Sequence, residues 1–167
     1  FCDWYIEMVK PRLYNEADET KAAALWTLKH VLIDALKLLH PYMPFITEEI
    51  FCTIQSEEES IMISDWPTYN EAYAFADDET AVELVKEAVK GIRNVRVTMN
   101  VAPNHKASVV VVSADEKVRK IFEDNTTFFK TLGSASEVKV QADTEGIGED
   151  AAQTVINGGV IYLPLAD

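Results

Sequence analysis

The chain has 167 residues, of which 48% are hydrophobic, and a formal net charge of −13. This length is enough to bury one core or two small ones. A signal-peptide pattern and an apolar run of roughly 18 residues are both absent, which predicts a soluble, cytoplasmic protein with no membrane partner. Cys2 and Cys52 have no cysteine or histidine at ligand spacing, so reduced, structural thiols are expected.

The acidic balance argues at first sight against a nucleic-acid ligand. The charges are, however, unevenly distributed. Residues 41–80 carry ten acidic and no basic side chains, whereas residues 81–106 carry five basic and two acidic ones. The segment 81–106 is therefore a candidate anion-binding face, although a solvated face is the commoner explanation of such a stripe.

The first hundred residues have helical periodicity. One face of the opening helix is apolar: Phe1, Trp4, Tyr5 and Met8. Pro11 is expected to kink this helix or end it near Lys10. Leucines in the segment 19–40 follow the spacing of a helix bundle, and its apolar circumference predicts a central helix packed on several sides. Because no earlier helix covers the opening face, self-association is also expected, most simply as a two-fold dimer.

A third helix is predicted from Pro44, because proline suits a first helical turn. An acidic loop and an extended segment at 61–67 follow it. The next helix, from about residue 79, presents a regular apolar face: Leu84, Val85, Ala88, Ile92, Val95 and Met99. It is expected to end near Asn100, because Pro103 disfavours helix before it. A basic stripe lies beside that apolar face: Lys86, Lys90 and Arg93, with Arg96 between the stripe and the face.

Beyond residue 103 the pattern predicts a β-α-β unit followed by a hairpin. A β-branched strand is expected at 107–112, and a capping pattern at 113–116 starts a helix whose middle is weakened at 125–127. A half-buried strand is expected at 137–142. Asn157-Gly158-Gly159 is the strongest hairpin signal in the chain. The predicted fold class is α+β, with a helical bundle at 1–103 and a small mixed α/β unit at 104–167.

The catalytic inventory is nearly empty. The chain has no Gly-rich phosphate loop, no G-x-S-x-G elbow and no H-E-x-x-H helix. His30 and His40 have no ligand partners at metal spacing, and adjacent carboxylates such as Glu48 and Glu49 point apart. The residues therefore predict no catalytic, cofactor or metal site, which disfavours a small standalone enzyme.

Five phrases occur in one order: FCDWYIEMVKPRL, LKLLHPYMPFITEEI, DWP, GIRNVRVTMNVAPNHK and GGVIYLPLAD. Together they resemble the anticodon-binding region of the bacterial valine–tRNA ligase family, which are class I aminoacyl-tRNA synthetases. The HPYMPFITEEI phrase is shared in kind with the isoleucine and leucine enzymes. IRNVR…MNVAP and the terminal GG…LPLA point to the valine type.

The resemblance implies a non-catalytic part of a larger enzyme that attaches valine to its tRNA with ATP. The family's HIGH-type and KMSKS-type ATP motifs do not occur here, so this part needs no cofactor. The implied partner is the anticodon arm of valine tRNA, whose unpaired bases would stack on aromatic side chains while cations guide the backbone. The candidate tRNA-binding residues are Lys86, Lys90, Arg93, Arg96, Lys106 and Trp4.

The sequence shows one departure from the family pattern and leaves three alternatives open. Asn104-His105-Lys106 replaces the two adjacent lysines expected after the proline phrase, which weakens the expected backbone contact of this loop. Trp4 is also suited to a place in the core. The chain is alternatively the corresponding domain of an isoleucine- or leucine-type ligase, or a helical protein–protein interaction module.

Overall fold

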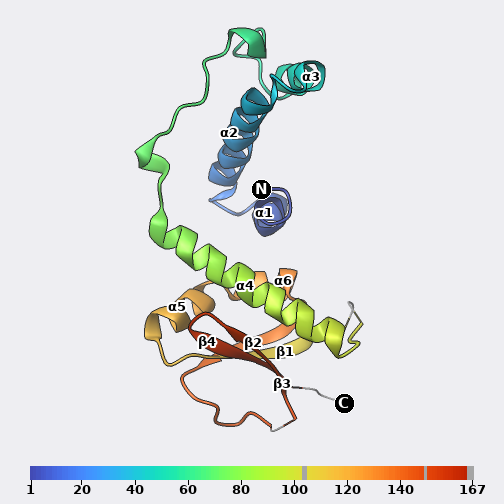
Figure 1. Ribbon diagram of the computed structural model, residues 1–167, viewed down its shortest axis with the longest axis vertical. Coiled ribbons are helices and arrows are strands. Elements are labelled where there is room, and N and C mark those ends of the chain that lie inside the picture. Colours follow the sequence, from blue (N-terminus) through green and yellow to red (C-terminus); the bar gives the residue numbers. More distant parts are fainter. Residues whose placement is uncertain (103–104, 149, 165–167) are drawn as a thin grey trace. The chain divides into compact units, whose positions relative to one another are not determined.

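The computed structural model describes residues 1–102, 105–148 and 150–164. By its internal contacts the chain divides into two compact units, Phe1–Ala74 and Phe75–Asp167 (Figure 1). The first unit is helical and the second holds the sheet. Within the described residues no helix is both long and apolar enough to cross a membrane.

The first unit contains three α-helices and two short 3-10 turns. They are α1 (Tyr5–Tyr14), α2 (Lys21–Leu39), α3 (Pro44–Ile54), η1 (Ile61–Ile63) and η2 (Glu71–Tyr73). Helix α2 packs against both α1 and α3, and α3 packs against η1. The buried core where these last elements meet consists of Leu36, Phe51 and Ile61. The predicted first turn at Pro44 is confirmed.

Helix α1 continues through Pro11 to Tyr14, so of the two predicted alternatives, a kink or an end near Lys10, the second is wrong. A proline removes only one backbone N–H, and the last turn is held by other bonds. Arg12 donates from Nε to Thr20 Oγ1 (2.8 Å) and from Nη2 to the Thr20 carbonyl (2.9 Å). These contacts tie the end of α1 to the start of α2.

Helix α2 is less enclosed than its apolar circumference predicts. Only Ala24 and Leu36 are buried, and the exposed apolar residues of this helix include Leu25, Trp26, Val31 and Leu38. Within the first unit α2 has only α1 and α3 as helical neighbours. The prediction of a helix packed on several sides is therefore wrong for this chain, because two neighbouring helices cover only part of a helix surface.

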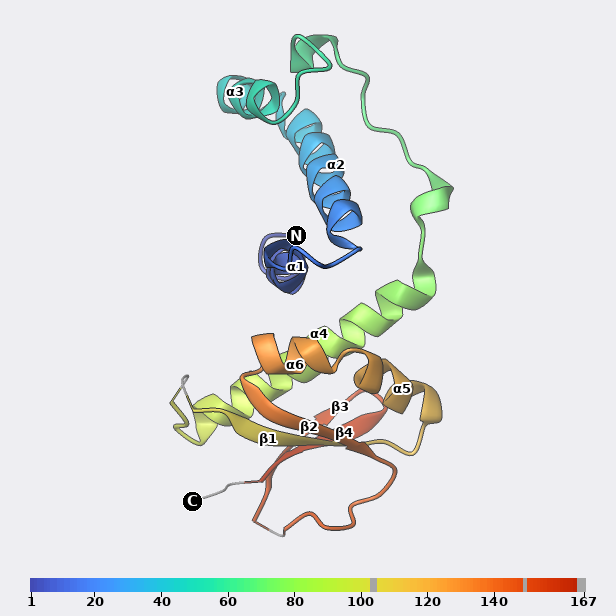
Figure 2. The same cartoon turned by 180° about the vertical axis from the view of Figure 1, so that it is seen from behind.

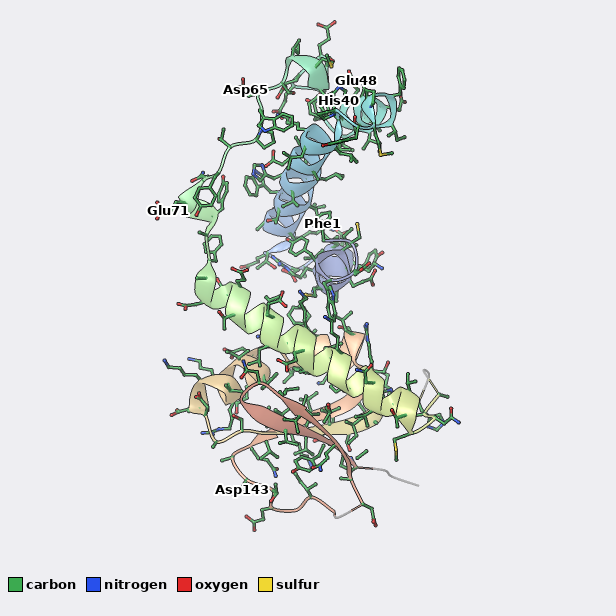
Figure 3. All side chains as sticks on the ribbon, in the orientation of Figure 1. Phe1, His40, Glu48, Asp65, Glu71 and Asp143 are labelled. Carbon is green, nitrogen blue, oxygen red and sulfur yellow. The ribbon has the colours of Figure 1, made fainter. Side chains whose placement is uncertain are left out.

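The corner between α2 and α3 is built around His40 and Thr47 (Figure 3 labels His40). His40 Nδ1 lies 2.7 Å from the hydroxyl of Thr47, which is buried and donates to the Met43 carbonyl. Glu48 on α3 accepts from the backbone N–H of Ile61 at 3.2 Å. That bond fixes the start of η1, where the sequence predicted an extended segment.

The second unit begins with one long helix and continues into a mixed sheet. Its elements are α4 (Ala76–Thr98), β1 (Ala107–Val112), α5 (Glu116–Asp124), α6 (Thr126–Leu132), β2 (Ala135–Gln141), β3 (Ala152–Ile156) and β4 (Gly159–Leu163). The strand order is β2-β1-β4-β3, with β1 and β2 parallel and the other pairs antiparallel. The predicted α+β class, β-α-β crossover and hairpin are confirmed. The predicted weak point at residues 125–127 separates α5 from α6.

Helices α4 and α6 lie on the same face of this sheet (Figure 1 and Figure 2). The buried side chains of the unit include Val85, Ala88, Val89, Ile92, Val109, Val111, Phe122, Phe129 and Ile161. Phe122 and Phe129 meet edge to face, with ring centroids 5.5 Å apart. Since α4 contacts the sheet, it belongs to the second unit. The domain boundary between residues 103 and 104 stays a prediction.

The last residue of α4 is Thr98, which agrees with the predicted end near Asn100, and Asn100 takes a positive φ of 58°. The Asn100 N–H bonds to the Val97 carbonyl (3.1 Å), and the Val101 N–H bonds to the Arg96 carbonyl (2.9 Å). This is the Schellman pattern, in which a left-handed residue lets the next N–H groups return to the last turn. Pro103, the predicted cause of this helix end, and Asn104 lie outside the described residues.

Candidate nucleic-acid interface

Helix α4 presents two different faces. One side of α4 packs against the sheet and against the neighbouring helices α5 and α6. The buried residues on this side include Leu84, Val85, Ala88, Val89 and Ile92. Asp77, Asp78 and Glu79 lie in its first turn, where carboxylates stabilise the positive end of a helix dipole. The basic residues follow further along the helix, so its two ends differ in charge.

Two lysines lie in the middle of α4. Lys90 is exposed, and Lys86 is half-buried. Lys86 Nζ forms an ion pair with Glu83 one turn earlier. A pair at the protein surface contributes little to stability and exchanges readily for other partners. An incoming phosphate would therefore compete with Glu83 for Lys86.

Arg93 joins α4 to α6. Its Nε donates to the carbonyl of Leu132 at 2.9 Å. Leu132 is the last residue of α6, and the final carbonyls of a helix lack intrahelical donors. The Arg93 side chain remains exposed while it satisfies this carbonyl. One side chain thus provides surface charge and fixes the angle between two helices.

Arg96 is buried, with only 6% of its surface exposed. It lies one turn after Ile92, in line with the buried face of α4. Its Nη2 donates to the carbonyls of Ala102 (3.1 Å) and His105. Its Nη1 has no hydrogen-bond partner among the residues that the structure describes. The guanidinium therefore holds the turn after α4, and the surface charge of this helix comes from the other three basic residues.

The remaining two candidates lie elsewhere. Lys106 is exposed and directly precedes β1, on the segment that Arg96 holds through His105. Trp4 is half-buried at the start of α1 and belongs to the first unit. The structure thus places Lys86, Lys90 and Arg93 together on one helix face and Lys106 in the same unit.

Lys130 is a candidate that the sequence pattern did not reveal. It is exposed in the last turn of α6, two residues before the Leu132 carbonyl that binds Arg93. Arg93 and Leu132 are 39 residues apart in the chain, so only the fold brings the end of α6, the turn that carries Lys130, to α4. A basic residue in the last helical turn was the available signal, but such residues are common for dipole reasons alone.

The described residues contain no group of three or more His, Cys, Asp or Glu side chains that could hold a metal ion. The basic face of α4 offers lysine and arginine side chains that bind anions. Lysine is a point charge, whereas arginine presents a planar fork that suits phosphate oxygens. A polyanion that follows α4 would meet Lys86, Lys90 and Arg93 in turn.

Comparison with known proteins identifies the family. A family model described as the anticodon-binding domain of tRNA ligase matches residues 1–111. The whole chain is 45% identical to a valine–tRNA ligase of Clostridium tetani, 41% to one of Clostridium perfringens and 34% to one of Bacillus cereus. In each case it covers all 167 residues but only 19% of the relative, so the chain spans about a fifth of these curated relatives. The match to residues 1–111 covers most of the chain, which therefore belongs to the anticodon-binding domains of tRNA ligases.

Proposed function

We propose that this chain binds the anticodon arm of a tRNA as part of a valine–tRNA ligase. The single observation that carries the proposal is the basic face of α4 in a chain of net charge −13. Family membership supports tRNA as the partner, and the names of the relatives support valine over isoleucine or leucine. The whole protein would attach valine to its tRNA with ATP in the cytoplasm, at a catalytic domain outside this chain.

The charge distribution favours a local mode of binding. Acidic residues elsewhere repel an RNA backbone, whereas Lys86, Lys90 and Arg93 attract it. Phosphate contacts of this kind position the RNA, and its sequence is read through unpaired bases. Binding by α4 alone would therefore be sensitive to salt and weakly selective.

A salt series tests the proposal. The probe is the anticodon stem-loop of valine tRNA, titrated by fluorescence anisotropy at several salt concentrations. We expect the logarithm of the binding constant to fall linearly with the logarithm of the salt concentration. The slope should become shallower by about 0.7 for each single-strand phosphate contact removed. The variant is Lys86→Gln with Lys90→Gln, and the control is Lys139→Gln, an exposed lysine on β2. The same slope in the variant and the unaltered chain would refute a role of α4 in binding.

We also propose that the isolated chain self-associates through its exposed apolar residues. Near the α2–α3 corner, Tyr42 is 84% exposed and Phe45 is 90% exposed. Large apolar side chains in such positions favour a partner over water. Light scattering at micromolar concentration tests this, with Phe45→Lys as the variant expected to shift the chain towards a monomer. A monomer at all concentrations in the unaltered chain would contradict it.

A further inference from the structure

Three aromatic rings gather on the first unit, outside the basic face of α4. We call Trp26, His30 and Tyr73 the Trp26 cluster. The Trp26 and His30 rings are stacked, with centroids 4.7 Å apart and 13° between their planes. Tyr73 of η2 meets both rings edge to face, at 6.1 Å and 5.6 Å.

The Trp26 cluster is open to solvent. Trp26 is 54% exposed and Tyr73 is 52% exposed, although such rings gain most when they are buried. A hollow of about 230 Å³ lies beside Trp26 and His30, and Lys29, Ile33 and Glu57 complete its lining. The hollow thus combines ring surface with the apolar side chain of Ile33.

The rings are held in place from one side. His30 Nε2 lies 3.6 Å from Asp34 Oδ2, one turn further along α2. His30 lies against both Asp34 and Tyr73 and stacks on Trp26, so it covers one face of the indole. A supported, half-exposed indole is a preorganised stacking surface, and it loses little conformational freedom when a planar ligand binds.

The rim of the hollow carries a donor and an acceptor side by side. Lys29 Nζ lies 3.9 Å from Glu57 Oε1, and both side chains are exposed. Lysine only donates hydrogen bonds, and an ionised carboxylate only accepts them. Nucleobase edges present acceptors next to donors in the complementary sense.

We propose that the Trp26 cluster binds one unpaired nucleobase of the RNA, which stacks on Trp26 while Lys29 and Glu57 bind its edge. The inference rests on the proposed function, because it requires an RNA partner. The ligand is a base and not a phosphate, since Lys29 already faces Glu57 and residues 1–74 carry thirteen acidic and five basic side chains. Stacking depends little on this net charge, because every base has a π face.

Tryptophan fluorescence tests the proposal directly. The reporter chain carries Trp4→Phe and Trp66→Phe, so that Trp26 is its only tryptophan. The probe is the valine anticodon stem-loop, and stacking of a base on Trp26 is expected to quench its emission. An arginine-rich peptide is titrated in parallel, since a cation held over aromatic rings is the competing occupant.

Affinity measurements locate the contact. Removal of a stacking aromatic ring is expected to weaken RNA binding about five-fold or more. We expect this loss of affinity for Trp26→Ala and a smaller loss for Tyr73→Leu. The affinity of Trp26→Phe should stay close to that of the unaltered chain, because phenylalanine keeps an aromatic ring. The matched control is Trp66→Ala, because Trp66 is 58% exposed but lies outside the Trp26 cluster. Replacement of one loop nucleotide by an abasic site should give the same loss, and Trp26→Ala should then add nothing further.

The outcomes separate the two proposals. RNA binding without quenching, and with equal affinity for Trp26→Ala and Trp66→Ala, overturns the inference and leaves the proposed function standing. If the arginine-rich peptide quenches the emission of Trp26 and the stem-loop does not, the inference is overturned in favour of a cationic partner. No RNA binding by the unaltered chain overturns both. The Glu57→Gln variant, which changes an exposed side chain, provides a second test. We expect it to change the relative affinities for stem-loops that differ in one loop base. If this variant and the unaltered chain bound all such stem-loops with the same relative affinities, the proposal would be contradicted.

Discussion

Gly91 of α4 lies directly against Thr154 of β3. A β-carbon added at Gly91 would lie 2.9 Å from Thr154 Cγ2 and 3.1 Å from its Oγ1. Carbon atoms do not approach so closely without displacement, so only glycine allows the helix this distance from the sheet. The contact fixes the depth at which α4 rests on the sheet, and hence the position of its basic face.

Gly91→Ala is expected to destabilise the second unit. Alanine favours a helix by about 1 kcal/mol over glycine, but overpacking costs about 1–3 kcal/mol, and Thr154 is stiff about χ1. We therefore expect a net loss of up to about 2 kcal/mol in the free energy of unfolding, measured by urea denaturation. Thr154→Ala in the same chain should recover most of it. Gly148→Ala is the control, because nothing lies within 4 Å of its added carbon.

The Arg96→Met variant should lower the stability of the second unit and leave the salt dependence of RNA binding unchanged. The variant loses the bonds to Ala102 and His105, and hydrogen bonds of charged groups contribute about 1.5–3 kcal/mol each. We expect a lower unfolding midpoint and faster hydrogen exchange at the Val101 amide, whose bond returns to the Arg96 carbonyl. A chain of unchanged stability with a smaller salt slope for RNA binding would show instead that Arg96 contacts phosphate.

Arg93→Lys should separate the two roles of Arg93. Lysine keeps the charge but lacks the planar fork that places one N–H on the Leu132 carbonyl. We expect the salt slope of RNA binding to persist and the stability of the second unit to fall by about 1 kcal/mol. Arg93→Gln serves as the comparison, since it should reduce both. Equal stability of all three chains would mean that the bond to Leu132 contributes nothing measurable.

Glu48 makes the stability of the first unit dependent on pH. The hydrogen bond from the Ser60 side chain is the main cause that lowers the pKa of Glu48 below its ordinary 4.5, and the Ile61 N–H contributes. A lowered pKa means that the ionised form stabilises the fold. This stability is present above pH 4.5 and is lost as the pH falls through the lower, folded-state pKa. Glu48→Gln should therefore flatten the acid side of the stability profile, followed by circular dichroism. An unchanged acid side would contradict the expected role of Glu48.

Local signals in the sequence were sufficient for most elements. Proline at the first turn of α3 and the Asn157-Gly158 turn each act over a few residues. Gly158 takes a φ of 81°, which glycine tolerates without strain. The weak point at Asn125 likewise separates α5 from α6. Such signals concern backbone conformation, and backbone conformation is decided by neighbours in the chain.

The environment of each side chain was decided by tertiary structure. Sequence placed Arg93 and Arg96 near one stripe, yet Arg93 reaches Leu132 on α6, and Arg96 is buried against a turn. The same holds for Trp26, which lies on the apolar circumference of α2 but stays 54% exposed, with the ring of Tyr73, 47 positions later, against it. Periodicity specifies which residues share a helix face, but the neighbours that cover that face come from distant segments. Burial and partners therefore follow from the packing of those segments, which no local pattern encodes.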